Sequence, residues 1–383
     1  MRGRILVVDH KTPTPDQDSG SASAFSYLQI LTRAGFDVTF APLNLADDGR
    51  YTAALNALGI TTLAAPRWPS MPAIIEEFAP RSDVLLLYRG PVAAEVFDLA
   101  RRVAPAARIL FHATDLHFLR IEREAALHGD AVQAEQARTM RTLELKLVAE
   151  ADASIVVSGY EQRLLSELVP AAKVHRIPIL REAPATPRGL ARWRAARPNW
   201  RRDILFIGGF DHTPNVDAVQ WFVDEVWPML LRRKCRHRFV IVGSNVPKKI
   251  AALACRTIRV RGYVKDLVPL FAGARLSVAP LRYGAGIKGK IVTSLSHGLP
   301  VVATSVAVEG MALRAGQDVL VADSAADMAE QIMRLCSDDE LWRSLSANGY
   351  QAFQNQYSLD AGAQAVLEVV DGLLARAARS VPS

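Results

Sequence analysis

Residues 276–304, LSVAPLRYGAGIKGKIVTSLSHGLPVVAT, contain an apolar run, a glycine-rich loop with two lysines, a helical stretch and a second apolar run. LSVAPL and PVVAT are typical of buried strands, and Gly298 marks the end of the helix between them. A strand that leads through a helix into another strand is a βαβ unit, which is found in parallel sheets. The segment therefore predicts an α/β fold.

Short apolar runs alternate with helical sequence in both halves of the chain. RILVVD, DVLLLYRG and ARILFHATD precede residue 180, and DILFIGGF, RFVIVGS and VLVAD follow residue 202. Residues 181–202 are rich in proline, arginine and alanine and have no apolar period. We predict two Rossmann-like domains at 1–180 and 203–358, a linker at 181–202, and a closing helix at 359–380 that packs back toward the N-terminal domain.

Composition narrows the class of protein. The 383 residues exceed the usual size of one core. The apolar runs fall short of the roughly 20 residues that span a bilayer, and no signal peptide is recognisable. Three cysteines lie far apart in the sequence, which favours a reducing compartment and offers no zinc spacing. We expect a cytoplasmic protein.

The net charge of +7 favours anionic partners, and no nucleic-acid motif accompanies it. The basic residues cluster at 187–202 and 231–239. Such clusters are usually solvated surface, but they also agree with peripheral contact to an anionic inner membrane face.

Ligands of open parallel sheets bind beyond the carboxyl ends of the strands. The loop at residues 282–290 is such a place, because its glycines allow close backbone approach and a helix begins there. Arg282, Lys288 and Lys290 would add positive charge. We interpret the loop as a seat for a diphosphate; a flexible surface loop with solvated lysines is the alternative. The loop FIGGFDHTPN offers a second set of candidate contacts, with Thr213 as a helix cap and Pro214 as the first helical residue: Gly209, Phe210, His212 and Asn215.

Several motifs, taken in order, carry a resemblance to a known family. FIGGFDHTPN, VIVGSN, VRGYVKDL, LSVAPLRYGAGIKGK, SLSHGLPVVATSVAVEGM and DVLVAD resemble the nucleotide-sugar domain of GT-B glycosyltransferases, specifically the retaining family four. The N-terminal half resembles the family more loosely, through LVVDHKTPTPDQDSGSASAFSYLQIL and FHATDLHFLR. The resemblance implies a GT-B fold, in which an acceptor-side domain faces a nucleotide-sugar domain across a cleft.

The resemblance also implies roles for individual residues. His112 matches a histidine that points at the donor sugar, although a histidine merely hydrogen-bonded at a strand end is the alternative. Lys288 and Lys290 would stabilise the leaving diphosphate and count, with His112, as catalytic. The donor-side residues would be Gly20, Gly209, Phe210, Gly262, Tyr263, Val264, Arg282, Gly284, Ala285, Gly286, Ile287, Thr293 and Glu309. The acceptor-side residues would be Asp18, Ser19, Arg89 and Asp115.

Two departures from the family pattern affect these roles. Many members carry two glutamates, the second of which binds the ribose, whereas this chain has Ala285 and Thr293 there. Ribose binding would pass to Glu309 or to the Thr293 hydroxyl. FDHTPN also lacks the family's basic phosphate pair, so the two loop lysines would carry more of the charge.

The expected function is metal-independent transfer of a hexose from a nucleotide-sugar donor to a hydroxyl acceptor, with retention and with no cofactor. The resemblance favours surface polysaccharide or glycolipid assembly, with a lipid-linked glycan as acceptor. An Asp-x-Asp motif can hold a metal and a nucleotide sugar in the other glycosyltransferase fold, and this chain has Asp-Gln-Asp at 16–18. We do not expect a metal there, because the motif lies in the first loop of the predicted N-terminal domain. A nucleotide-sugar epimerase, a phosphorylase and a non-catalytic sugar-nucleotide-binding protein are alternatives. A dinucleotide oxidoreductase is disfavoured because no Gly-x-Gly-x-x-Gly follows RILVVD.

Overall fold

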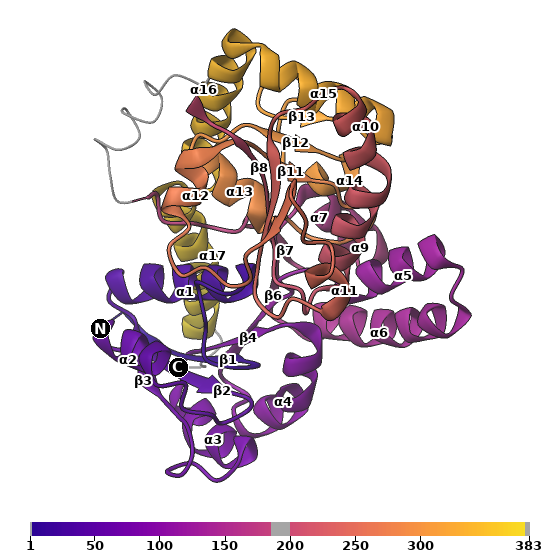
Figure 1. The fold of residues 1–383 in the computed structure, drawn as a ribbon. Coiled ribbons are helices and arrows are strands. Elements are labelled where there is room, and N and C mark those ends of the chain that lie inside the picture. The colour runs from indigo at the N-terminus through magenta and orange to yellow at the C-terminus, as the bar shows by residue number, and fades with distance from the viewer. Residues whose placement is uncertain (1, 185–199, 380–383) are drawn as a thin grey trace. The chain divides into compact units, whose positions relative to one another are not determined.

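The computed structural model describes residues 2–184 and 200–379, which form two compact α/β units (Figure 1). The first unit comprises Met1–Pro15, Gly20–Leu180 and Gly362–Ser383, and the second comprises Asp16–Ser19 and Arg181–Ala361. The predicted linker falls largely on residues 185–199, which lie outside the described residues.

The first unit is built on a parallel sheet of seven strands in the order β3-β2-β1-β4-β5-β6-β7. Its central strands are buried along almost their whole length, as expected when helices cover both faces. The strand bounds are β1 Arg4–Asp9, β2 Asp37–Pro42, β3 Thr61–Thr62, β4 Val84–Tyr88, β5 Arg108–His112, β6 Ala153–Val156 and β7 Val174–Arg176.

Polar side chains start several helices of this unit. Ser70 accepts from the backbone N–H of Ala73, and Ser158 and Glu161 form a capping box. Helices α5 and α6 run side by side as a hairpin (Figure 1). The helices are α1 Ser19–Arg33, α2 Arg50–Ala57, α3 Met71–Phe78, α4 Gly90–Val103, α5 His117–His128, α6 Ala131–Glu150 and α7 Gly159–Leu168, with a 3-10 turn at Ala79–Arg81.

The last helix, α17 (Leu359–Arg379), contacts the N-terminal part of the chain. Gly362 lies so close to Leu180 that a Cβ at this position would be 2.2 Å from the Leu180 Cδ2. Arg2 also donates a hydrogen bond to Asp371. Nearly all of α17 therefore belongs to the first unit.

The second unit is built on a parallel sheet of six strands in the order β10-β9-β8-β11-β12-β13. Its strands are β8 Asp203–Ile207, β9 Arg238–Val242, β10 Ile258–Val260, β11 Ala274–Ala279, β12 Val301–Ala303 and β13 Leu320–Val321. Its helices are α9 Thr213–Trp221, α10 Trp227–Arg232, α11 Lys248–Ala251, α12 Val268–Gly273, α13 Gly289–Ser296, α14 Ser305–Val308, α15 Ala325–Ser337 and α16 Asp339–Gln356. The predicted parallel α/β class is confirmed.

A π-helical turn at Phe222–Val226 separates α9 from α10. The backbone N–H of Trp227 donates to the carbonyl of Phe222, five residues back. Pro228 follows and cannot donate, so the regular ladder is interrupted at this point. Helix α9 begins at Thr213 with His212 as the cap, one residue earlier than predicted.

No helix among the described residues is long and apolar enough to cross a bilayer.

Candidate functional site

The strand order of the second sheet reverses between β8 and β11, because the chain runs outward from this pair in both directions. Ligands of open α/β sheets bind at such a switch point, beyond the carboxyl ends of the strands. The loop after β8 begins with Gly208 and Gly209, and the loop after β11 is the glycine-rich loop at 280–288. The two loops predicted to bind a ligand thus share one end of the sheet.

Glycines give the second of these loops its path. Gly286 has φ 65° and Gly284 has φ 150°, conformations that side-chain-bearing residues rarely adopt. Helix α13 then starts at Gly289, so its positive N-terminal end lies at the same place. The flanking side chains Ala285 and Ile287 are buried, which anchors the loop against the domain.

Lys288 is turned into its own loop. Its side chain is buried, and Nζ donates to the carbonyl oxygens of Ala285 and Gly286, each at 2.8 Å. A tight glycine loop leaves carbonyls facing inward, and buried carbonyls require donors. Lys288 thus holds the loop together through its amine, and the direct contact with a diphosphate that the sequence indicated stays a prediction.

Lys290, on the first turn of α13, faces the loop after β8. Its Nζ lies 4.2 Å from the centre of the Phe206 ring and donates to Asn215 Oδ1. Burial, with a smaller effect from the nearby Lys288 charge, lowers the pKa of Lys290 to about 7. At neutral pH the Lys290 amine is therefore only partly protonated, whereas the sequence predicted a full positive charge on this side chain. A bound anion would raise this pKa and draw a proton onto the amine.

Arg282, the third predicted cation, is paired within the second unit. Its Nε donates to Asp217 Oδ2 at 2.9 Å, and this bond raises the pKa of the guanidinium. Asp217 lies on α9, so the ion pair ties the glycine loop to that helix.

The loop after β8 is held by Asn215. Its Nδ2 donates to the Gly209 carbonyl at 2.7 Å, and a Cβ on Gly208 would be 2.7 Å from the same nitrogen. Phe210 is buried, with its ring 6.3 Å from that of Phe206. The glycines of FIGGF therefore make room for the amide.

The turn after β10 lies beside the loop after β9, because the Gly243 N–H donates to the Gly262 carbonyl at 2.9 Å. Gly262 has φ 66°, and the Tyr263 side chain beside it is 41% exposed. Val264 packs against the core cluster around Val240 and Val242. An exposed aromatic ring next to two loop backbones is suited to contact with a planar group such as a nucleobase.

The two candidates for ribose binding are both half-buried. Thr293 lies on α13, where its carbonyl accepts from His297 Nδ1 at 2.9 Å. Glu309 follows the short helix α14, beyond the end of β12. Their roles stay predictions.

Two predicted acceptor-side residues, Asp18 and Ser19, belong to the second unit. Arg181 Nη2 donates to Ser19 Oγ at 2.6 Å and to its carbonyl at 3.0 Å. A Cβ on Gly289 would be 2.0 Å from Ser19 Oγ, so this glycine is needed for the close approach.

A second polar cluster lies at the switch point of the first sheet, where β1 and β4 are neighbours. Arg89, which caps α4 with φ 60°, donates through Nε to Asp9 Oδ1 at 2.6 Å. Burial alone would raise the pKa of Asp9, but Arg89 and the hydrogen bond from His10 lower it to about 2. The guanidinium also lies against Gly20, where a Cβ would be 2.8 Å from Nη2.

His112, at the end of β5, is fully buried between two tyrosines. Its ring stacks on Tyr88 at 4.6 Å and meets the edge of Tyr27 at 4.9 Å. Nδ1 accepts from the Thr114 N–H at 3.1 Å, so the proton of the neutral ring is on Nε2. Burial lowers the pKa of His112 to about 3.

The Nε2–H of His112 has no acceptor in the part of the chain that the structure describes. The hydroxyl groups of Tyr27 and Tyr88 are in the same situation. Each unsatisfied buried donor costs about 1–3 kcal/mol. His112 is therefore a neutral ring with a potential donor at Nε2, and its contact with a donor sugar stays a prediction.

Asp115 lies just before α5 and forms an ion pair with Arg120 of that helix, with the Arg120 Nε 3.2 Å from the Asp115 Oδ2. Beside it, the buried Glu144 accepts from the N–H groups of His117 and Phe118 and from His117 Nδ1. The sequence offered no signal for Glu144, because a glutamate in an amphipathic helix normally faces solvent.

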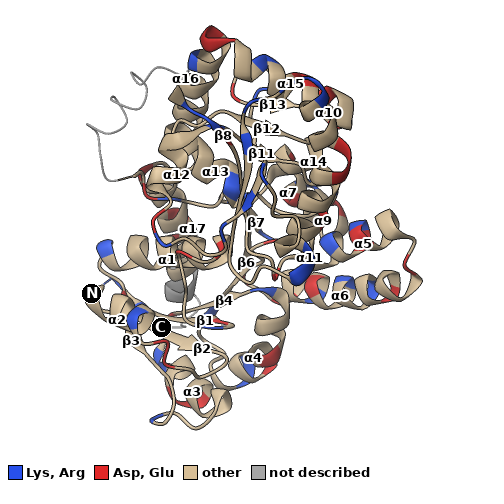
Figure 2. Ribbon diagram, in the orientation of Figure 1, with Lys and Arg blue, Asp and Glu red and all other residues tan. Residues whose placement is uncertain are grey.

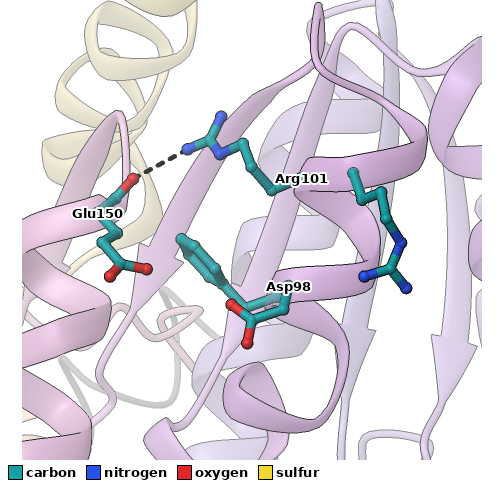
Figure 3. A pocket seen from close by; sticks show the side chains of 5 residues that line it. Asp98, Arg101 and Glu150 are labelled. Atoms are coloured by element: carbon teal, nitrogen blue, oxygen red, sulfur yellow. Dashed lines mark hydrogen bonds between the residues drawn. The ribbon is translucent and has the colours of Figure 1, made fainter.

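Other surfaces are less suited to a ligand. A hollow of about 460 Å³ on the first unit is lined by Phe97, Asp98, Arg101, Arg102 and Glu150 (Figure 3). Arg101 is already engaged there by Asp152 at 3.0 Å and by the Glu150 carbonyl at 2.9 Å.

Helices α5 and α6 carry both signs of charge (Figure 2). Within residues 2–184 and 200–379, no three His, Cys, Asp or Glu side chains form a metal-binding group.

Comparison with known proteins agrees with this arrangement. Residues 201–338 match the family model of Glycosyl transferases group 1. An uncharacterized 44.6 kDa protein in the cps region of Klebsiella pneumoniae is 21% identical over 164 residues, 40% of this chain and 42% of that protein. The match thus spans less than half the length of this curated relative.

Solved structures share the fold, among them the following two. Sucrose-phosphate synthase from Thermosynechococcus elongatus has a TM-score of 0.75 at 17% identity, covering 98% of this chain and 100% of the other. Anabaena HepE in complex with UDP-glucose has a TM-score of 0.70 at 13% identity, covering 97% and 100%. Identities this low establish the fold alone.

Residues 201–338 therefore form a group 1 glycosyltransferase domain, and the chain has the GT-B fold. The fold that the ordered motifs predicted is confirmed.

Proposed function

We propose that the protein transfers a hexose from a nucleotide-sugar donor to a hydroxyl acceptor, with retention and without a metal. The observation that carries this proposal is the switch point of the second sheet, where the glycine loop, the start of α13 and the Lys290 amine meet. The Anabaena relative of the same fold was solved with UDP-glucose, which supports this class of donor.

The proposed chemistry follows from the charge that develops on the donor. The C1–O bond to the diphosphate breaks, the acceptor oxygen forms a new bond to C1 on the same face, and the hydroxyl proton passes to the departing diphosphate. Groups that meet this charge more strongly in the transition state than in the ground state accelerate the reaction. Lys290 and the amides at the start of α13 would take this role, and Lys288 would keep the loop in shape.

The first unit would position the acceptor. Arg89, at the β1/β4 switch point, would contact the acceptor, and His112 offers a neutral Nε2–H that would donate to the transferred sugar. The relative from the cps region supports a role in the assembly of surface polysaccharide or glycolipid, with a lipid-linked glycan as acceptor. Contact with the inner membrane face would follow from such an acceptor.

A thermal-shift panel of UDP, GDP, dTDP and CMP tests the donor site. A nucleotide at 100 times its dissociation constant should stabilise the protein by about 2.7 kcal/mol. Transfer from the matching nucleotide sugar should then survive EDTA, and NMR of the product should show the donor's anomeric configuration. A protein that binds none of these nucleotides, or that inverts the anomeric centre, would contradict the proposal.

A further inference from the structure

Asn215 connects the two loops at the β8/β11 switch point. Its side chain is 5% exposed and bridges the Gly209 carbonyl, which accepts from Nδ2, and the Lys290 amine, which donates to Oδ1. A carbonyl can only accept and an ammonium can only donate, so the amide has one satisfactory orientation. The backbone N–H of Asn215 also donates to the His212 carbonyl at 2.9 Å, which holds the residue on the first turn of α9.

The surroundings of Lys290 explain why an amide is suited to this position. Its amine lies over the face of Phe206, and the charge that acts on it is the like charge of Lys288. The single carboxylate of α9, Asp217, is paired with Arg282. Helix α13 contains no acidic residue, and Asp203 of β8 is paired with Arg238. An amide oxygen aligns the amine without cancelling its charge, whereas a carboxylate would form an ion pair with it.

We propose that Asn215 is a positioning residue that holds Lys290 at the diphosphate seat while leaving the lysine's charge for the ligand. The inference rests on the proposed function, because it takes the diphosphate to bind where the two loops meet. It assigns Asn215 an action through Lys290, in place of the direct ligand contact that the sequence indicated. It also accounts for Gly208, where a side chain would displace the amide.

Two variants with opposite effects on Lys290 provide the test. Asn215→Ala removes a hydrogen bond to the charged amine, so nucleotide affinity should fall about 10-fold or more. The loss of nucleotide affinity at alkaline pH (the alkaline limb of the binding profile) should also begin at a lower pH, because the pKa of Lys290 falls when the hydrogen bond is removed. The nearly isosteric Asn215→Asp adds a negative charge, so the limb should move to higher pH while affinity at neutral pH still falls. Isothermal titration with the nucleotide that gives the largest thermal shift, between about pH 6 and pH 9, measures both quantities.

Lys290→Met separates this inference from the proposed function. If Asn215 acts through Lys290, Asn215→Ala should change affinity by less than about 2-fold in the Lys290→Met background. Asn348→Ala is the matched control, because it removes an amide on α16 that donates to the Gln317 carbonyl. Two results would overturn the inference about Asn215 and leave the proposed function intact. One is a pH dependence of binding in both Asn215 variants that equals that of the wild type. The other is an effect of Asn215→Ala on affinity that is as large in the Lys290→Met background as in the wild type. Wild-type affinity in Lys290→Met would overturn the diphosphate seat itself.

Discussion

Replacing Lys290 by methionine should make the second unit more stable and should greatly lower the rate of the proposed sugar transfer. Burial lowers the pKa of this lysine from 10.5 to about 7. One pKa unit corresponds to about 1.36 kcal/mol, so the folded state disfavours the charged amine by at most about 5 kcal/mol. The Lys290 side chain is only partly buried, and the variant loses the hydrogen bond to Asn215. We therefore expect the free energy of unfolding to rise by about 2 kcal/mol.

The stability gained in the methionine variant should depend on pH. The unfolded lysine keeps its proton up to a pKa of about 10.5, whereas the folded lysine releases it near 7. Between these values the unfolded state binds more protons, so the stability of the wild-type protein should rise as pH increases from 7. The methionine variant lacks this contribution, and its advantage should shrink by pH 9.

Thermal unfolding at pH 7 and pH 9 measures this difference. A gain of about 2 kcal/mol should raise the Tm by about 4–8 °C at pH 7. The turnover with a nucleotide sugar should fall by about 10²–10³, the usual loss for one electrostatic donor. Lys249→Met, at an exposed lysine of α11, is the control. A variant that melts below the wild type at both pH values and keeps full turnover would refute the reasoning.

Three further predictions follow from the same contacts. Lys288→Met should destabilise the second unit by about 1.5–3 kcal/mol, because two loop carbonyls lose a charged donor; urea unfolding that matches the wild type would contradict it. His112→Gln should keep more activity than His112→Ala, and neither should alter the pH profile between about pH 5 and pH 8, because the pKa of His112 is about 3; a limb near pH 6 that vanishes in either variant would argue against a neutral donor. Asp9→Asn should cost the first unit about 3 kcal/mol above pH 4, because it removes the carboxylate that faces Arg89. Since the pKa of Asp9 is lowered to about 2, this contribution should disappear as pH falls toward 2, and an acid-unfolding midpoint equal to that of the wild type would count against it.

Local patterns were sufficient to predict the strands and the glycine loop. The runs VLLLY and RILVVD are buried along nearly their full length, as continuous apolar runs in a parallel sheet should be. The loop at 282–290 was expected to bind a ligand because it follows a buried strand and precedes a helix, and it does lie at a switch point. These features depend on neighbours in the chain, which the sequence displays directly.

Contacts between distant residues could not be predicted in this way. Cys235 and Cys336 lie far apart in the sequence, yet the Cys336 thiol lowers the pKa of Cys235 in the folded chain. The burial of Glu144 against the start of α5 was likewise invisible, because it depends on how two helices pack.

The two loop lysines mark the boundary between these kinds of information. The order of residues alone determined that cations, glycines and a helix start would coincide in the second unit, since all lie within one βαβ unit. Only the folded chain decided that the Lys288 amine turns toward its own carbonyls and that Lys290 meets Phe206 and Asn215. The reason is physical: the charge of a lysine depends on the dielectric and the partners around its amine, and these come from strands and helices that the sequence does not place side by side.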